Sequence, residues 1–207
     1  MTYSILYVDC PWQYKDKANA GKRGAEHKYQ CMSLAELIGM RPYIDSIAND
    51  NSVMFMWATG PIMPDALKVM EYWEFDYRTI AFTWIKTNPK GTGRSLDTGQ
   101  PLYLATFLNR EGEIDTYGDF LGMGNHTRAN AEFVLLGVRG KGLQRVNNSV
   151  RSTVISPIRE HSRKPAEVRT AIENLYGEQE RIELFAREVV SGWDAHGLET
   201  DKFKSPE

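Results

Sequence analysis

The chain has 207 residues, of which 42% are hydrophobic and 25% charged, a composition typical of one globular domain with a substantial core. Its formal net charge of -2 gives no sign of a nucleic-acid partner, so any basic surface has to be local. Two cysteines are too few for a disulfide framework, and the longest apolar runs are far too short to span a membrane. With no signal peptide at the start, we expect one cytoplasmic domain, 1–207, without a membrane partner.

Strand and helix patterns alternate along the chain and predict an α/β fold. The first strand, Ile5 to Val8, is apolar and rich in β-formers, and it ends on the polar Asp9. Further strands are expected over 52–59, 78–86, 132–138, 153–158 and 181–185. Helices are expected from the capping box at Ser33 to residues 49–51 with a break at Pro42, over 64–73, and after Lys164-Pro165, with this proline in the first turn. Because several strands are continuously apolar, helices should cover both faces of the sheet.

Two segments lack such patterns. Residues 13–31 form a polar loop that contains Tyr14 and Tyr29, and long loops in compact domains tend to be functional. Residues 87–125 are rich in glycine and scattered charge, which predicts a mostly irregular segment with a short helix near Leu102 to Leu108.

The motif Asp9-Cys10-Pro11-Trp12 stands at the carboxyl end of the first strand, where open α/β sheets bind their ligands. Its residue types suit methylation of an exocyclic amine, whose lone pair is delocalised into the base. The Asp9 carboxylate and the Cys10 carbonyl can accept the two amine hydrogens, Pro11 stiffens the turn, and Trp12 offers a flat face to a base. Taken alone, the four residues fit a polar turn with a buried Trp equally well.

Within the whole chain the motif resembles the Asp-Pro-Pro-Trp signature of the MT-A family of adenine-N6 methyltransferases. Six further segments resemble the family in its order: Tyr29 to Ser33, Phe55 to Gly60, Trp84 to Asn88, Glu132 to Gly140, His161 to Pro165 and Ile182 to Arg187. The resemblance covers nearly the whole chain.

This resemblance implies a Rossmann-like methyltransferase sheet that is circularly permuted, with the catalytic motif early and the cofactor strand near the C-terminus. It implies S-adenosylmethionine as methyl donor, S-adenosylhomocysteine as product, and no metal. The catalytic residues it implies are Asp9, Cys10, Pro11 and Trp12; the cofactor-binding residues are Asp9, Lys164, Phe185, Arg187, Gly197, Leu198 and Glu199. For Lys164 and Arg187 the alternative is a solvated charge at the end of an element.

Two residues depart from the family pattern. Cys10 replaces the usual first Pro, so we expect a less rigid turn with activity retained at the same or a lower level. Leu198 stands where many relatives have Asn, so we expect it to contact the cofactor by packing alone.

Substrate binding is expected to involve Trp12, Tyr14, Tyr29, Lys86, Arg128 and Asn130, with His126 also at the border of the pocket; core packing is the competing interpretation for Tyr14. Residues at about 87–130 are the candidate target-recognition insertion. Seven basic residues stand against one acidic residue, Glu160, and predict a local phosphate-binding face, with a solvated surface as the alternative: Arg139, Lys141, Arg145, Arg151, Arg159, Arg163 and Lys164.

We therefore expect a DNA adenine-N6 methyltransferase of a prokaryotic or phage-infected cell, with DNA preferred over RNA by family analogy. Three alternatives stay open: an RNA adenosine methyltransferase with the same site, a non-catalytic nucleic-acid-binding subunit, and a methyltransferase for another base amine such as that of cytosine. Recognition sequence, strandedness and formation of a homodimer are left open by the sequence.

Overall fold

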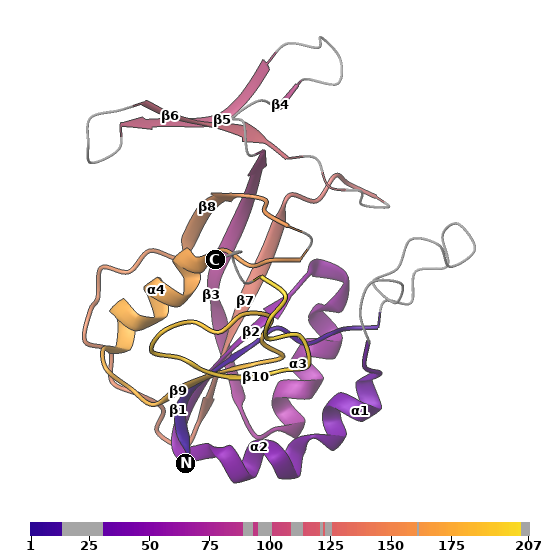
Figure 1. Ribbon diagram of the computed structural model, residues 1–207, viewed down its shortest axis with the longest axis vertical. Coiled ribbons are helices and arrows are strands. Elements are labelled where there is room, and N and C mark those ends of the chain that lie inside the picture. Colours follow the sequence, from indigo (N-terminus) through magenta and orange to yellow (C-terminus); the bar gives the residue numbers. More distant parts are fainter. Residues whose placement is uncertain are drawn as a thin grey trace.

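The computed structural model describes residues 1–13, 31–88, 93–94, 101–108, 114–120, 122, 126–160 and 162–203 (Figure 1). In these residues ten strands form one sheet in the order β10-β9-β1-β2-β7-β3-β6-β5-β4, with β8 also paired to β3. The strands are β1 (Tyr3–Val8), β2 (Ala48–Ala58), β3 (Asp76–Asn88), β4 (Gly93–Arg94), β5 (Pro101–Leu108), β6 (Ile114–Asp119), β7 (Ala131–Arg139), β8 (Thr153–Pro157), β9 (Arg181–Leu184) and β10 (Asp194–His196). The helices are α1 (Leu34–Gly39), α2 (Arg41–Ile47), α3 (Met63–Tyr72) and α4 (Ala166–Tyr176), with a short 3₁₀ turn, η2 (Gly60–Ile62).

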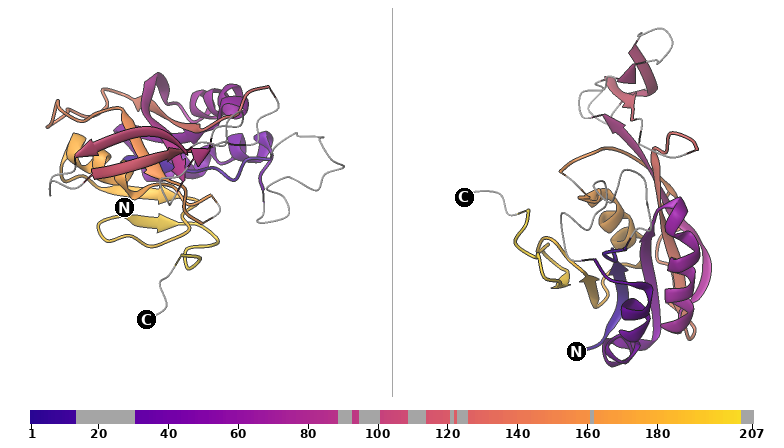
Figure 2. Two further views of the ribbon diagram at one scale, coloured as in Figure 1. Left: turned by 90° about the horizontal axis from the view of Figure 1, so that it is seen from above. Right: turned by 90° about the vertical axis from the view of Figure 1, so that its right-hand side faces the viewer.

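Alternate residues of the central strands point to opposite faces of the sheet, and each face has its own core. Leu6 and Met54 pack on one face with residues of α1, α2 and α3. Tyr7 and Phe55, the next residues along β1 and β2, pack on the other face with residues of α4. Figure 2 shows the helices on the two sides of the sheet when it is seen along its edge. The predicted α/β class with helices on both faces is therefore confirmed; the circular permutation stays a prediction.

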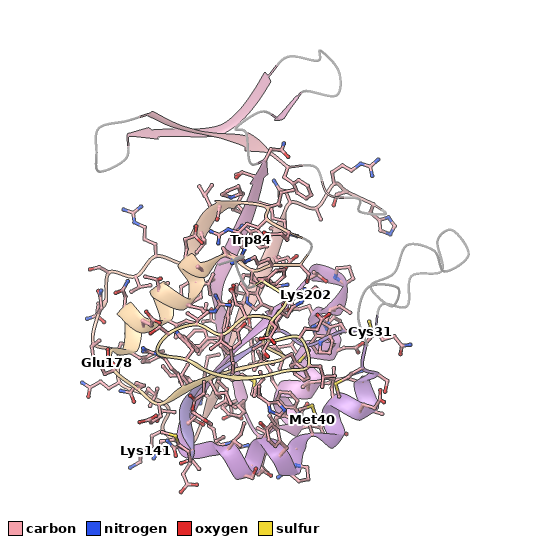
Figure 3. All side chains as sticks on the ribbon, viewed as in Figure 1. Cys31, Met40, Trp84, Lys141, Glu178 and Lys202 are labelled. Atoms are coloured by element: carbon pink, nitrogen blue, oxygen red, sulfur yellow. The ribbon has the colours of Figure 1, made fainter. Side chains whose placement is uncertain are left out.

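The direction of the strands brings several loops to one edge. Strands β1, β2, β9 and β10 run parallel, whereas β7 runs antiparallel to β2 and to β3. The carboxyl ends of β1, β9 and β10 therefore meet the beginning of β7 at the same edge. Strand β8 runs parallel to β3, so its end leads to the same place. The indole of Trp84, which Figure 3 labels, donates a hydrogen bond of 2.9 Å to the Ser156 carbonyl and so links these two strands.

Two expected boundaries shift. The helix that was expected to reach residues 49–51 ends at Ile47, and these residues belong to β2. The reason is pairing across the sheet: the Asn49 side chain donates to Ser4 Oγ (2.9 Å), and Asn51 Oδ1 accepts the Lys141 amide (2.7 Å). Pro165 is the N-cap of α4 and so lies just before the first helical residue.

The expected short helix near Leu102 to Leu108 is wrong, because these residues form β5. This strand pairs antiparallel with β6, and β6 pairs with the end of β3. The expectation of a mostly irregular segment is likewise wrong for β4, β5 and β6. In Figure 1 the three strands extend beyond the end of β3, away from the helices. Pairing between strands far apart in sequence outweighs the weak local signal here.

Helices long and apolar enough to cross a membrane are absent from the part of the chain that the structure describes.

Candidate active site

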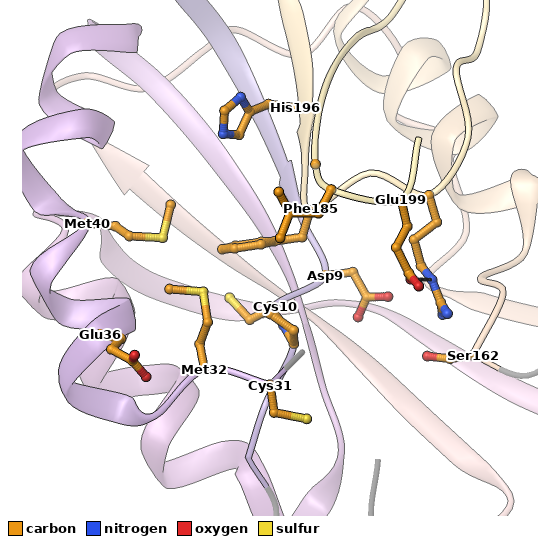
Figure 4. A pocket seen from close by; sticks show the side chains of 14 residues that line it. Asp9, Cys10, Cys31, Met32, Glu36, Met40, Ser162, Phe185, His196 and Glu199 are labelled. Carbon is orange, nitrogen blue, oxygen red and sulfur yellow. Dashed lines mark hydrogen bonds and ion pairs between the residues drawn. The ribbon is translucent and has the colours of Figure 1, made fainter. Parts of the chain in front are cut away.

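A cavity of about 550 Å³ opens at the edge where the strands end. Asp9 follows β1, Phe185 follows β9 and Gly197 follows β10. Figure 4 shows Asp9, Ser162 and Glu199 on one side of the cavity, and the sulfur-bearing side chains of Met32, Met40 and Cys10 on the other. The cavity therefore has a charged side at Asp9 and Glu199, and an opposite side where methionine side chains lie beside the Glu36 carboxylate. Six of the seven predicted cofactor residues line it: Asp9, Phe185, Arg187, Gly197, Leu198 and Glu199.

A second, smaller cavity of about 60 Å³ adjoins the first and shares Asp9, Cys10 and Ser162 with it. Its other walls are Trp12, Trp57, Ala58, Thr59, Glu132 and Lys164. The seventh predicted cofactor residue, Lys164, thus lies beside the large cavity, at the junction with the small one. Two cavities that meet at one carboxylate are suited to two molecules that react with each other there.

Four charged side chains form a nearly buried chain across this junction. Lys164 Nζ lies 3.1 Å from Asp9 Oδ2 and 3.3 Å from Glu132 Oε2, and Lys86 Nζ lies 2.5 Å from Glu132 Oε1. The exposed fraction of each of these side chains is below 20%. The lysines also lie against aromatic rings. Lys164 Nζ is 5.4 Å from the centroid of the Trp57 ring, and Lys86 Nζ is 5.1 Å from that of the Trp84 ring.

Burial affects the two carboxyl groups of this chain differently. For Asp9, burial raises the pKa above its ordinary value, and the Lys164 ammonium opposes this shift without cancelling it. For Glu132, burial alone would raise the pKa, but the ammonium groups of Lys164 and Lys86 outweigh burial and hold the pKa below its usual range. Glu132 therefore stays ionised to a lower pH than usual, whereas Asp9 binds a proton more readily than an ordinary aspartate.

The turn of the motif has a defined backbone geometry. The Cys10 carbonyl accepts the Trp12 amide at 2.9 Å, which closes a tight turn around Pro11. A carbonyl oxygen has two lone pairs, so one remains for another donor. The segment is held from the side by Met32, whose amide donates to the Pro11 carbonyl at 2.8 Å. Burial raises the pKa of the Cys10 thiol, which favours the neutral thiol over the nucleophilic thiolate.

Trp12 fits both interpretations of the motif, as a buried core residue and as a wall of a binding site. It is 6% exposed and packs in the core on the side of α1 to α3, and it also lines the small cavity. Its indole Nε1 is buried without a hydrogen-bond partner in the described part of the chain.

The end of β9 is shaped by a close backbone approach. Phe185 has a φ of 59°, a conformation that is uncommon for a bulky residue. The Ala186 amide donates to the His196 carbonyl at 3.0 Å, which brings Gly197 against this turn. A Cβ on Gly197 would lie 2.4 Å from the Ala186 carbonyl oxygen, so only glycine fits without movement.

A second ionic network stabilises the turn at Phe185 that follows β9. Arg169 of α4 binds Glu183 of β9 through two nitrogens, at 2.7 and 3.2 Å, and Glu188 at 2.9 Å. Arg163 reaches Glu188 at 2.9 Å, and Arg187 pairs with Glu199 at 3.0 Å. Burial raises the pKa of Glu183, although Arg169 opposes the shift. This network fixes the backbone on which Phe185 and Arg187 are carried.

Predicted substrate residues are only partly brought together. Lys86 contacts Glu132 and lines neither cavity; Arg128 and Asn130 lie in the segment before β7 and line neither cavity. His126 and Arg128 are exposed. Tyr14 and Tyr29 lie outside the described residues. Leu198 is 89% exposed beside the large cavity.

The prediction of one basic face over residues 139–164 is wrong. Arg139 is paired with Ser52 near the start of β2, at the edge opposite to Asp9, and its guanidinium binds Asp45. Arg159 pairs with Glu167, and Arg163 with Glu160 and Glu188. Arg139 therefore lies apart from Lys164, and Arg139, Arg159 and Arg163 are paired with carboxylates from outside residues 139–164.

Glu132 and Ser162 were missed as site residues. A charge at the start of an otherwise apolar strand was the available signal for Glu132. Ser162 lines both cavities with a φ of 64°, and the sequence carries no comparable signal for it.

Metal-binding clusters of three or more His, Cys, Asp or Glu side chains are not found among the residues that the structure describes.

Comparison with known proteins gives consistent similarities. The model of the MT-A70 family matches residues 3–104 and 108–199. The type II methyltransferase M.MunI from Mycoplasma sp is 30% identical over 95% of this chain and 77% of its own length. An MT-A70-like N(6)-adenosine-methyltransferase from Arabidopsis thaliana is 27% identical over 93% of this chain, and the METTL3 subunit from Danio rerio is 29% identical over 96%. The chain spans only 23% and 28% of the length of these two proteins.

Proposed function

Because the chain belongs to the MT-A70 family of methyltransferases, we propose that it transfers a methyl group from S-adenosylmethionine to the N6 amine of adenine in DNA. The observation that carries this proposal is the position of Asp9, whose carboxylate borders both the large and the small cavity.

The large cavity fits a molecule with a charged amino acid end and a purine end. The volume of about 550 Å³ is in the range of cofactor sites. Asp9 is a partner for an ammonium group and Lys164 for a carboxylate, and Glu199 can accept from ribose hydroxyls. The side chains of Met40 and Phe185 suit the apolar face of a flat ring. When bound, S-adenosylmethionine supplies an electrophilic methyl group on a sulfonium centre. The residues Asp9, Lys164, Phe185, Arg187, Gly197, Leu198 and Glu199 are our proposed cofactor site.

The small cavity is proposed to hold the target amine. The Asp9 carboxylate accepts one N–H hydrogen and the Cys10 carbonyl, with its second lone pair, accepts the other. These two acceptors turn the nitrogen lone pair out of conjugation and toward the large cavity. Trp12 forms the wall against which the base packs. Transfer of the methyl group to the nitrogen would break its bond to the sulfonium sulfur, which keeps the electron pair in S-adenosylhomocysteine. The methylated nitrogen would then shed a proton, and Asp9, whose pKa is raised by burial, is suited to take it.

The choice of DNA is supported by size and similarity. The chain spans 77% of the type II methyltransferase M.MunI but only about a quarter of the two adenosine methyltransferases. The names of the latter support adenine N6 as the target atom and keep RNA adenosine as the second candidate substrate. We further propose that the strands β4, β5 and β6, within the segment at about 87–130, contact the nucleic acid and select the target.

Mass spectrometry of nucleosides tests the base and the polymer together. DNA and RNA are isolated from cells that express the protein, with Asp9→Ala expressed at the same level as the control. We expect N6-methyladenine above background in DNA from the wild type alone. Methylated adenosine confined to RNA would overturn the DNA assignment, and equal methylation with Asp9→Ala would overturn the proposed site.

A further inference from the structure

We propose that Phe203 is a positioning residue that clasps Arg187 and Arg163 and, through Arg187, holds Glu199 at the wall of the large cavity. The inference rests on the proposed function because it takes this cavity to be the cofactor site. Phe203 lies beyond residue 199, where the match to the MT-A70 family ends.

The Phe203 ring contacts two guanidinium groups at once. Its centroid lies 5.0 Å from Arg163 Cζ and 5.2 Å from Arg187 Cζ, both within the range of attractive cation–π contacts. Each guanidinium is also paired with a carboxylate, Glu188 for Arg163 (2.9 Å) and Glu199 for Arg187 (3.0 Å). The ring therefore stands between two ion pairs and connects them.

The short segment before Phe203 is folded back on Glu199. The Lys202 amide donates to the Glu199 carbonyl at 2.9 Å, and the Lys202 ammonium donates to both carboxylate oxygens at 2.8 and 2.9 Å. This turn brings Phe203 to Arg187, the second cation that binds the same carboxylate. Glu199 is therefore bound by both Arg187 and Lys202. The position of Arg187 depends in turn on its contact with the Phe203 ring.

Phe203 and Arg163 do not line the large cavity, whereas Arg187 and Glu199 do. Phe203 instead borders a small void of about 10 Å³ behind the site, together with Asp9, Ser162 and Phe185. An effect of Phe203 on a bound ligand therefore has to pass through the residues that it positions. Loss of the ring frees the Arg187 side chain to rotate away, and Glu199 then loses one of its two cationic partners.

The chemical nature of the clasp separates it from simple packing. A leucine at this position fills much of the same volume but has no negative ring face for a guanidinium. A tyrosine keeps that face. The clasp predicts that tyrosine replaces phenylalanine and that leucine does not.

Calorimetric titration with S-adenosylhomocysteine tests the inference on the purified full chain. We expect Phe203→Ala and Phe203→Leu to bind about threefold to tenfold more weakly than wild type, and Phe203→Tyr to bind within about twofold of it. In steady-state assays the KM for the methyl donor should rise by the same factor, while kcat at saturation changes little. Val189→Ala, at a side chain that is 66% exposed, is the matched control and should bind like wild type.

Each result bears on a defined claim. Wild-type affinity in Phe203→Ala overturns the clasp, and wild-type affinity in Phe203→Leu alone reduces it to packing and overturns the proposed role of the ring. Weak binding in both with an unchanged melting temperature supports it; weak binding only in proportion to a lower melting temperature overturns it. If the wild type itself bound no S-adenosylhomocysteine, the proposed cofactor site would fail first, and the clasp with it.

Discussion

The ammonium of Lys164 lies 3.1 Å from the carboxylate of Asp9, and both side chains are nearly buried where the two cavities of the site meet. The contact joins residues 155 positions apart, one after β1 and one before α4. Asp9 keeps a raised pKa in spite of this cation, because burial has the larger effect. An ionised carboxylate in such a place lowers the free energy of unfolding, and residues that destabilise the fold in this way are typical of functional sites.

Asp9→Asn should reduce methyl transfer about 10³-fold, because the amide places a donor where the amine needs an acceptor. Binding of S-adenosylhomocysteine, measured by calorimetry, should fall far less than kcat. Glu71→Gln, a charge removal on the far surface of α3, serves as the control and should leave both quantities unchanged. Retention of more than a tenth of the wild-type rate by Asp9→Asn would exclude Asp9 as the acceptor.

The same substitution should stabilise the fold at neutral pH. Since the pKa of Asp9 is higher in the fold than in the unfolded chain, folding favours the protonated form, and ionisation costs stability as the pH rises above the unfolded value near 3.8. We expect Asp9→Asn to raise the free energy of unfolding at pH 7 by about 1 kcal/mol, a gain of about 2–4 °C in Tm. The gain should vanish below pH 3.8, where the wild-type carboxyl is protonated in both states. A lower Tm at pH 7 would contradict this sign.

Lys86→Met should destabilise the fold by about 1–3 kcal/mol at pH 7, because among the described residues Glu132 then keeps only Lys164 as a cationic partner. The pKa of Glu132 is lowered in the fold, so its ionisation contributes stability that is present above its ordinary pKa of 4.5 and lost as the pH falls through the lower folded value. Urea unfolding at pH 7 and at pH 3.5 should therefore show a difference from wild type that shrinks in acid. Lys68→Met, at an exposed lysine of α3, is the control. A difference that is constant with pH would mean that Lys86 acts through packing alone.

From the residue pattern alone, the site was predictable where its residues are consecutive and not where strand direction matters; Lys164, Phe185 and Glu199 were expected only from the resemblance to the MT-A family. Asp9 to Trp12 are consecutive, and a strand that ends on a carboxylate predicts their place in the sheet. Glu132 stands at the beginning of its strand, and it reaches the site only because β7 runs antiparallel to β2. Hydrophobic periodicity gives the existence of a strand but not its direction or its neighbours. For the same reason, β5 and β6, whose pairing is with each other and with the end of β3, were not foreseen.

Gly197→Ala should weaken both the fold and the cofactor cavity. The added Cβ would meet the Ala186 backbone at 2.4 Å from its oxygen and 2.6 Å from its nitrogen, and backbone atoms cannot move aside as a flexible side chain can. We expect a loss of about 1–3 kcal/mol in stability, as for other overpacked sites. Affinity for S-adenosylhomocysteine should also fall, because the hydrogen bond from Ala186 to His196 holds one wall of the cavity. At Gly60 an added Cβ would meet nothing within 4 Å, so Gly60→Ala is the matched control. Equal Tm values for the two variants would exclude the close approach.

Cys10→Pro should retain methyl transfer within about threefold, because residue 10 acts through its carbonyl and not its thiol. The thiol is buried and its pKa is raised, which disfavours the thiolate that a nucleophile or base would need. Proline at this position stiffens the turn that the Trp12 amide already closes on the Cys10 carbonyl, and the carbonyl keeps its direction. The measurement is kcat/KM for an unmethylated oligonucleotide substrate in Cys10→Pro beside Cys10→Ala, which removes the thiol without changing the backbone. If both variants lost activity together, the side chain would be the functional group; if Cys10→Pro alone lost it, the ring would have turned the carbonyl away from the amine.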